Sequence, residues 1–323
     1  MRCSSKKYTI LVFLVSVFLF GCGNTDPAVP YGMLSNDTNY TFGVQGDEQT
    51  VKMFAEDLCA ADSNITDTSS INYSGIYSAA VYDINSLNVL YSYNATERVN
   101  PASITKIMTA LIILENMNLD ENITVPDVTI SEGGVQLFKL NEGDIIGARD
   151  LFNVMLIYSG NDCALAFAKS ICGTEEEFVN LMNARAEELG CTNTHFSNCM
   201  GLTDSDHYTT AYDLYLIFNE CIKHQEFIDA INTEEYTCTY TSGGEFTTRT
   251  VITTNKYLTG EYSSPNNVAI IGGKTGTTTA AGKCILLYAK DNSGNPYITV
   301  VMGAADEPDL YSTMNQLCND IIN

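Results

Sequence analysis

The strand patterns at the two ends of the chain constrain its fold more than any other feature. Residues 77–94 contain two apolar runs separated by the turn-like segment 83–88, which predicts a β-hairpin. A second hairpin is predicted where the runs 283–290 and 297–304 flank the sequence DNSGNP. Helical patterns dominate between these hairpins, over 103–117, 148–157, 161–171, 175–189 and 210–223. We therefore expect an α/β (α+β) fold, in which one antiparallel sheet draws strands from both chain ends, packs with helices and carries an inserted, mostly helical lobe.

Three further segments complete this framework. The glycine-containing run 270–277 predicts a strand along the edge of a cleft, because glycines there let another backbone approach closely. The amphipathic stretch 309–322 predicts a last helix. Residues 227–272 hold short β-like runs whose order the pattern does not give.

The N-terminus predicts export. A start with three cations precedes the apolar run 9–20, which as a helix rises only about 18 Å and is too short for a bilayer core of about 30 Å. Residues 1–21 are therefore predicted to be a signal peptide. The segment ends in LFGC, which resembles the lipobox of exported lipoproteins, so Cys22 is the expected lipidation site. The alternative is an ordinary cleaved signal with an incidental cysteine.

The polar composition of the next segment divides the chain further. Residues 22–75 are rich in Asn, Asp, Ser, Thr and Gly and are predicted to be a flexible tether. About 50 such residues would have a reach of roughly 40 Å. The predicted parts are thus the signal peptide 1–21, the tether 22–75 and a folded catalytic domain at 76–323.

Charge and cysteine content exclude several classes of protein. Lys and Arg number 16 against 39 Asp and Glu, giving −23, which argues against nucleic acid and against electrostatic docking on an anionic bilayer. With 3 His and no Trp, a histidine-rich metal centre is not expected. Of the 11 cysteines, nine remain once Cys3 is cleaved off and Cys22 is lipidated, an odd number that excludes complete pairing. Buried free thiols are expected, with no metal and no cofactor.

Three short motifs occur in order along the folded part. They are Ser103-Ile-Thr-Lys106, Ser159-Gly-Asn161 and Lys274-Thr-Gly276. This trio is the signature of penicillin-binding proteins and class A β-lactamases. Singly the first two are weak, since Ser-x-Asn also occurs elsewhere in the chain, for example at 293–295.

The first motif has a physical rationale as a nucleophile and its base. Ser103 precedes an apolar helical run, so it lies at a helix start, where free amides and the dipole favour a developing anion. Lys106 lies one turn on, within reach of the Ser103 hydroxyl. To act as a base near neutral pH, its pKa must fall by about three units, which costs roughly 4 kcal/mol. Burial and a second cation, Lys274, favour that shift. The alternative is a helix cap followed by a solvated lysine.

The other two motifs can supply a proton relay and substrate contacts. Ser159 and Asn161 lie in a predicted tight turn between helices, where a hydroxyl can pass a proton and an amide can hold a carbonyl. Lys274 and Thr275 offer a cation and a donor to a carboxylate. For Ser159-Gly-Asn161 the alternative is a helix stop followed by an N-cap. For Lys274-Thr-Gly276 it is a glycine-rich strand in a turn.

The context of the trio resembles one enzyme family over about residues 76–305. The similar segments are NPASITKIMTAL, KLNEGD, LIYSGNDCALAFAK, FVNLMNARAEELGCTNTHFSNCMGL, HYTTAYDL and GGKTGTTTAAGKCILL. They are similar to the D-alanyl-D-alanine carboxypeptidases of the low-molecular-mass penicillin-binding type, serine peptidase family S11. The resemblance implies a β-lactamase/transpeptidase-like fold and removal of the terminal D-Ala from peptidoglycan stem peptides. It also implies β-lactams as inhibitors.

The resemblance also implies a role for each motif residue. Ser103 would be the acylated nucleophile, Lys106 its base and Ser159 the relay to the leaving amine. The backbone amides of Ser103 and Thr277 would form the oxyanion hole, each worth roughly 3–4 kcal/mol in the transition state. The implied substrate-binding residues are Asn161, Lys274, Thr275, Gly276 and Thr277. The implied location is the extracytoplasmic face of a bacterial cell membrane, at the cell wall, through the lipid anchor only.

Two departures from the family pattern stand out. Family members often place an arginine just after the last strand to help bind the carboxylate, but no arginine follows Arg249 here. Carboxylate recognition is then expected to rest on Lys274, Thr275 and Thr277. Some relatives add a C-terminal β-domain and an amphipathic membrane helix, an anchor that lipidated Cys22 would replace.

Three alternatives stay open. A class A-like β-lactamase would need a deacylating glutamate in an E-x-x-L-N string after the second motif, and none follows. A zinc-dependent D,D-peptidase could use Cys191, His195 and Cys199, although no fourth ligand is obvious; His207 and His224 are expected to be structural. A non-catalytic sensor would be acylated once by penicillin and signal.

Overall fold

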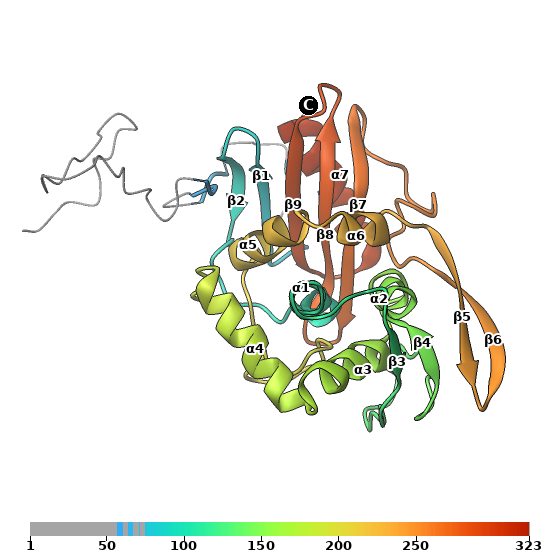
Figure 1. Cartoon of the computed structure of the whole chain (residues 1–323). Helices are drawn as coiled ribbons and strands as arrows, with labels where there is room; N and C mark the ends of the chain where they lie inside the picture. The colour runs from blue at the N-terminus through green and yellow to red at the C-terminus, as the bar shows by residue number, and fades with distance from the viewer. Residues whose placement is uncertain (1–56, 61–63, 67–70, 72–74, 323) are drawn as a thin grey trace, which may run out of the picture. The chain divides into compact units, whose positions relative to one another are not determined.

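A five-stranded antiparallel sheet joins the two ends of the folded chain (Figure 1). The computed structural model describes residues 57–60, 64–66, 71 and 75–322. In spatial order the strands are β2 (Asn88–Tyr93), β1 (Ser78–Asp83), β9 (Pro296–Ala304), β8 (Gly282–Asp291) and β7 (Val268–Thr278). Both predicted hairpins are present, and β1 pairs with β9, so the sheet draws strands from both ends as expected.

The five predicted helices of the lobe are all present. They are α1 (Lys106–Asn116), α2 (Ala148–Ile157), α3 (Asn161–Cys172), α4 (Glu175–Glu188) and α5 (Ala211–Cys221). A 3-10 helix, η1 (Ala102–Thr105), precedes α1. The side chains of Thr174 and Thr210 accept hydrogen bonds from the amides of Glu177 and Asp213, and these N-caps fix where α4 and α5 begin.

The region that the sequence did not order contains a helix and most of a second sheet. Helix α6 (Gln225–Ile231) follows α5 directly. A four-stranded sheet then has the order β3 (Asn122–Thr124), β4 (Ile145–Gly147), β5 (Glu235–Ser242) and β6 (Glu245–Ile252). Its two long strands, β5 and β6, form a hairpin. The edge strand β7 of the five-stranded sheet begins 16 residues after β6 ends.

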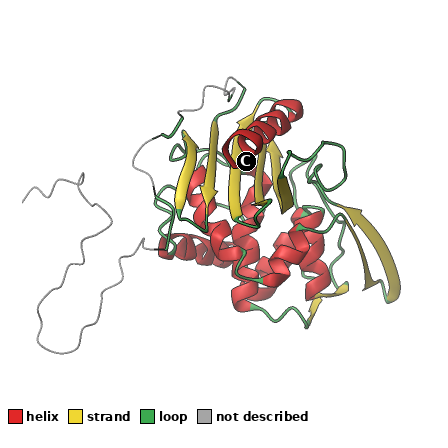
Figure 2. Ribbon diagram, turned by 90° about the horizontal axis from the view of Figure 1, so that it is seen from above, coloured by secondary structure: helices red, strands yellow, loops and turns green. Residues whose placement is uncertain are grey.

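The central sheet is covered on both faces, as Figure 2 shows from above. Along β8, Cys284 and Leu286 belong to the core shared with the lobe helices. Their neighbours Ile285 and Leu287 belong to a second core, formed with α7 (Glu307–Leu317) and the π-helical turn η2 (Cys318–Ile322). Because alternate side chains of a strand point to opposite faces, β8 reads as a continuous apolar run.

Several predictions fall wholly or partly outside the described residues. The signal peptide 1–21 and Cys22 lie outside them, as does most of the segment 22–75. Within that segment, the Cys59 amide donates to the Tyr215 hydroxyl at 2.9 Å, and Ile65 forms a β-bridge with Ser92. These contacts attach residues 59 and 65 to the folded domain. None of the helices within the described residues combines the length and apolarity needed to cross a bilayer.

Candidate active site

The candidate nucleophile lies in a tight turn ahead of α1. Ser103 belongs to the 3-10 helix η1 and is half-buried, whereas Lys106, the first residue of α1, is fully buried. Ala102 adopts a left-handed φ of 48°. The Thr105 hydroxyl donates to the Ala102 carbonyl at 2.8 Å, which holds this turn in place. The helix start expected from the sequence is therefore a 3-10 turn with the serine in it.

The Lys106 amine has three oxygen neighbours. Its Nζ lies 2.7 Å from Asn161 Oδ1, 2.7 Å from the Met200 carbonyl and 3.2 Å from Ser103 Oγ. A neutral amine has two N–H donors and one lone pair. Asn161 Oδ1 and the Met200 carbonyl accept hydrogen bonds from the two N–H groups of the neutral amine. The lone pair of Lys106 Nζ is then left facing the Ser103 hydroxyl. This arrangement suits a base that takes the proton of Ser103.

Burial lowers the pKa of both site lysines. It lowers the pKa of Lys106 to about 8, against a smaller opposing effect of the neighbouring thiols and Asp162. Burial also lowers the pKa of Lys274 well below its usual value, and the nearby Lys106 charge adds to this effect. Lys106 is therefore largely available as a neutral amine at a mildly alkaline pH.

Ser159 lies in the short connection between α2 and α3, in a strained conformation with a φ of 67°. Its Oγ accepts a hydrogen bond of 2.9 Å from Lys274 Nζ, which links this turn to the central sheet. A Cβ on the next residue, Gly160, would lie 2.8 Å from Cys163 Sγ, so a larger residue there would force the Cys163 side chain to move. Asn161 then begins α3, which aims its amide at Lys106.

Strand β7 passes directly beside the nucleophile turn. A Cβ on Gly276 would lie 2.9 Å from the Pro101 carbonyl and 3.0 Å from the Ser103 nitrogen, so only glycine permits this approach. Thr277, the next residue, is exposed. On the other side, Thr275 Oγ1 donates to Thr254 Oγ1 at 2.6 Å. The edge-strand expectation for 270–277 agrees with this geometry.

The structure thus brings the three motifs together. Ser103, Lys106 and Asn161 form one hydrogen-bonded group, and Ser159 and Lys274 form a second. Asn161 follows Ser159 by two residues, so the two groups adjoin.

Sequence reasoning missed the loop that supplies the third partner of Lys106. Asn198 Oδ1 accepts hydrogen bonds from the amides of Met200, Gly201 and Leu202 at 3.1, 2.7 and 3.0 Å. This cap holds the Met200 carbonyl at Lys106. Gly201 has a φ of 89°, and a Cβ there would lie 1.9 Å from the Ala102 carbonyl. The Asn-x-x-Gly pattern in FSNCMGL was the available signal for such a tight loop.

The residues of the zinc alternative have separate partners. Cys191 Sγ contacts the Asp213 carbonyl at 3.6 Å, His195 Nδ1 the Asp206 carbonyl at 2.6 Å, and Cys199 Sγ the Glu175 carboxylate at 3.3 Å. Within residues 57–60, 64–66, 71 and 75–322, no three His, Cys, Asp or Glu side chains are grouped as metal ligands.

His207 supports the nucleophile turn from below. Its Nδ1 accepts from the Ser197 amide at 3.0 Å, so its Nε2 carries the proton and donates to Thr105 Oγ1 at 2.8 Å. Burial lowers its pKa to about 4, which keeps the ring neutral. His207 thus contacts the turn through Thr105.

Comparisons with known proteins identify the family. The family model described as D-alanyl-D-alanine carboxypeptidase, Peptidase_S11, matches residues 69–306. The chain is 34% identical over 233 residues to the D-alanyl-D-alanine carboxypeptidase DacF of Bacillus subtilis, covering 71% of this chain and 57% of that protein. It is 32% identical over 232 residues to DacC of Escherichia coli, covering 69% and 55%. The chain therefore spans a little over half the length of these curated relatives.

Solved structures agree on the fold. The Streptomyces K15 DD-transpeptidase matches with a TM-score of 0.69 and 27% identity, covering 75% of this chain and 95% of that one. A D-alanyl-D-alanine carboxypeptidase from Mycobacterium tuberculosis matches with a TM-score of 0.68 and 25% identity, covering 79% and 94%. The β-lactamase/transpeptidase-like fold is confirmed. The chain belongs to the S11 family of D-alanyl-D-alanine carboxypeptidases.

Proposed function

We propose that the protein is a serine-type D-Ala-D-Ala carboxypeptidase that removes the terminal D-alanine from peptidoglycan stem peptides and is acylated by penicillins. Family membership supports the reaction class. The observation that carries the proposal is the fully buried Lys106 amine, 3.2 Å from Ser103 Oγ and with its pKa lowered to about 8. A serine hydroxyl is a poor nucleophile until such a base takes its proton.

In the acylation step, Lys106 Nζ takes the hydroxyl proton as Ser103 Oγ bonds to the carbonyl carbon of the penultimate D-alanine. The oxyanion is held by the backbone amides of Ser103 and Thr277. In support, strand β7 runs close to the Ser103 turn, since a Cβ on Gly276 would lie 3.0 Å from the Ser103 nitrogen. The carbon–nitrogen bond then breaks. The leaving D-alanine amine receives, through Ser159, the proton that Lys106 took from Ser103, so Lys106 becomes neutral again before deacylation. The Ser159 hydroxyl accepts a hydrogen bond from Lys274.

Deacylation reverses these roles with water. Lys106 takes a proton from a water molecule that attacks the Ser103 ester, and the shortened peptide leaves with Ser103 protonated again. Asn161 uses its Oδ1 to accept from Lys106, which leaves its NH2 group for a substrate carbonyl. The substrate lies along strand β7, at Lys274, Thr275, Gly276 and Thr277.

We further propose how the protein reaches its substrate. Residues 1–21 act as a signal peptide, Cys22 is lipidated, and the segment 22–75 tethers the catalytic domain 76–323 to the extracytoplasmic face of a bacterial membrane. The composition of these segments supports this division. Expression of the chain and its Cys22→Ser variant in a bacterial host tests it. The wild type should partition into detergent and carry lipid on Cys22, and the variant should not.

Purified residues 22–323 test the activity. We expect release of D-alanine from a peptide ending in D-Ala-D-Ala, and covalent labelling by penicillin at Ser103. Both should be lost in Ser103→Ala, and labelling that survives this substitution would contradict the site assignment. Rapid hydrolysis of penicillin would instead indicate a β-lactamase, acylation without peptide turnover a sensor, and chelator-sensitive activity a zinc enzyme.

The same assay separates hydrolysis from transfer. The Streptomyces K15 protein is named a DD-transpeptidase, in which an amine replaces water as the acyl acceptor. Addition of glycylglycine to the reaction would reveal transfer as a new peptide product. We expect free shortened peptide to remain the main product.

A further inference from the structure

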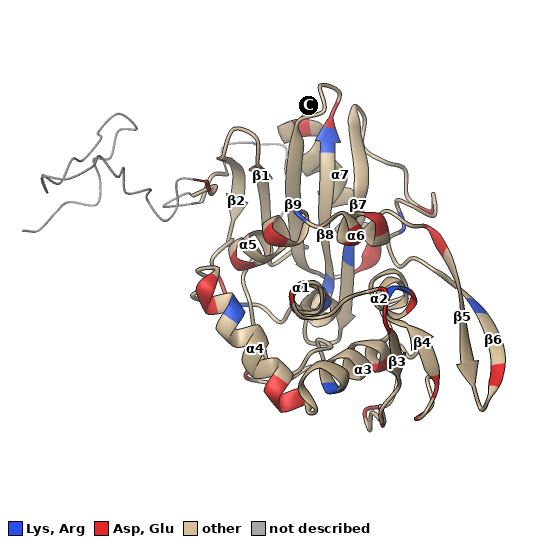
Figure 3. Ribbon diagram, viewed as in Figure 1, with Lys and Arg blue, Asp and Glu red and all other residues tan. Residues whose placement is uncertain are grey.

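Lys283 is a lysine without an ion-pair or hydrogen-bond partner among the described residues of a strongly acidic protein. The chain has 39 acidic against 16 basic residues, and acidic positions appear on α4, α5 and α6 and along the β5–β6 hairpin (Figure 3). Even so, Lys283 has no hydrogen bond or ion pair to any of the described residues, although it is half-buried. Among the described lysines and arginines, only the exposed Lys139 shares this lack of a polar or aromatic partner.

The register of the central sheet places Lys283 beside the active site. It lies directly opposite Thr277 in the β7–β8 pair. Directly opposed residues share a face, with their Cβ atoms about 5 Å apart. Because side chains alternate along a strand, Thr275 and Thr277 also share a face. Lys283 therefore lies on the face that presents both threonines proposed to bind the substrate carboxylate.

The strand is irregular at this position. On its other side Lys283 pairs with Ala304, and the register of β8 with β9 shifts between Lys283 and Ile285. Gly303 at this bulge has a φ of 71°. Bulges of this kind bend a strand and redirect a side chain, and they are common next to active sites.

The two motif lysines, Lys106 and Lys274, are already engaged by other groups, so a further cation could bind the substrate carboxylate. Lys106 is occupied by Ser103, Asn161 and the Met200 carbonyl. Lys274 is buried against Ser159 and the Thr275 carbonyl, at 2.9 Å from each. Both amines are therefore held in contacts within the site, and burial lowers the pKa of each.

We propose that Lys283 binds the terminal carboxylate of the substrate, together with Thr275 and Thr277. The inference rests on the proposed carboxypeptidase function and names the cation in its substrate site. It applies to any acyl donor whose leaving group carries a carboxylate, which includes the terminal D-alanine of a stem peptide.

Two matched thioesters test this role. One is an N-acyl-D-alanyl thioester of thioglycolate, whose leaving group carries a carboxylate, and the other is its methyl ester, in which that charge is masked. In Lys283→Gln we expect kcat/KM for the acid to fall about tenfold or more, through a higher KM, because a partly buried ion pair is lost. The methyl ester should change less than twofold, and Lys283→Arg should keep most of the activity on the acid.

Lys290→Gln is the matched control, since Lys290 lies on the same strand at the end where β8 pairs with Ala269 and Pro296. It should leave both substrates unaffected. An equal loss on both substrates in Lys283→Gln, or no loss on either, would overturn the inference while leaving the enzyme reading intact. If the wild type cleaves neither thioester nor a D-Ala-D-Ala peptide, the proposed function fails and the inference fails with it.

Discussion

At the scale of single residues, the site depends on the neutral form of the Lys106 amine. Lys106 is fully buried, and the two shortest contacts of its Nζ go to oxygens that accept N–H groups. The protonated form would place a full charge in this interior, which is why burial lowers the pKa to about 8. The neutral form can both hold its position and take the proton of Ser103.

The pH dependence of acylation follows from this shift. Below about pH 8 Lys106 is protonated and cannot accept a proton, so the rate of acylation should rise with pH and level off above that value. Stopped-flow measurement of penicillin acylation from pH 6 to pH 10 checks this, because it isolates the first step. A rate that is flat across pH 8, or one that falls as pH rises, would show that Lys106 is not the base.

A second prediction concerns the proton relay. Ser159→Ala should lower kcat/KM on a D-Ala-D-Ala peptide by about 10²–10⁴, the usual contribution of a positioned proton donor. The control is Ser293→Ala, because Ser293 also begins a Ser-Gly-Asn sequence but lies in an exposed turn. Equal activity of the two variants in a D-alanine release assay would rule out the relay role.

At the scale of elements, close backbone approaches position the nucleophile. The loop capped by Asn198 meets η1 at Gly201, and strand β7 meets it from the other side at Gly276. Both approaches are too close for a side chain, so the conformation of the Ser103 turn depends on two glycines from distant parts of the sequence.

Gly201→Ala tests this dependence. A Cβ there would lie 1.9 Å from the Ala102 carbonyl, so the turn that carries Ser103 must move, and penicillin acylation should fall at least tenfold. The control is Gly294→Ala, which has a similar φ of 86° but no atom within 4 Å of the added Cβ. The control should lose only the backbone strain of about 1–2 kcal/mol and keep full activity. Normal acylation in Gly201→Ala would contradict the positioning role.

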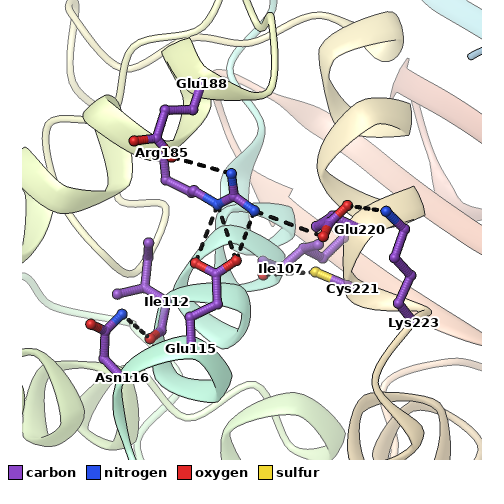
Figure 4. Close-up of polar contacts among 9 residues, drawn as sticks. All are labelled: Ile107, Ile112, Glu115, Asn116, Arg185, Glu188, Glu220, Cys221 and Lys223. Carbon is purple, nitrogen blue, oxygen red and sulfur yellow. Dashed lines mark hydrogen bonds and ion pairs between the residues drawn. The ribbon is translucent and has the colours of Figure 1, made fainter. Parts of the chain in front are cut away.

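At the scale of the whole molecule, an ion-pair network ties three lobe helices together (Figure 4). Arg185 of α4 makes a bidentate contact with Glu115 of α1, with a shortest distance of 2.8 Å. It also lies 3.8 Å from Glu220 of α5 and 3.2 Å from Glu188. Since α1 begins with Lys106, this network connects the catalytic helix to its neighbours far from the reaction.

The network should matter for stability more than an ordinary surface pair. The Arg185 side chain is 24% exposed and bidentate, so Arg185→Met should lower the free energy of unfolding by about 1–3 kcal/mol. Arg149→Met is the control, because its partner Asp120 is 74% exposed and such pairs contribute about 1 kcal/mol at most. Urea unfolding of both variants checks this. Equal effects would show that the network has no special role.

The sequence by itself determined the framework and the chemistry-bearing residues. Hairpins at both ends, five lobe helices and the segment 270–277 followed from local periodicity and turn residues, which are properties of short stretches of chain. The motif residues were identified with their order, and the family resemblance with them. Helix α6 was missed. The β-like runs of 227–272 were expected but not ordered, because β5 and β6 pair only with each other and with a short, distant strand.

Only the tertiary structure decided how these residues meet. The Met200 carbonyl at Lys106, the Thr254 hydroxyl at Thr275 and the position of Lys283 opposite Thr277 all join segments far apart in sequence or depend on strand register. No local pattern encodes such contacts, because they arise when distant elements pack and exclude water. The lowered pKa of Lys106 has the same origin, since a lysine becomes a base here only once the rest of the fold has buried it.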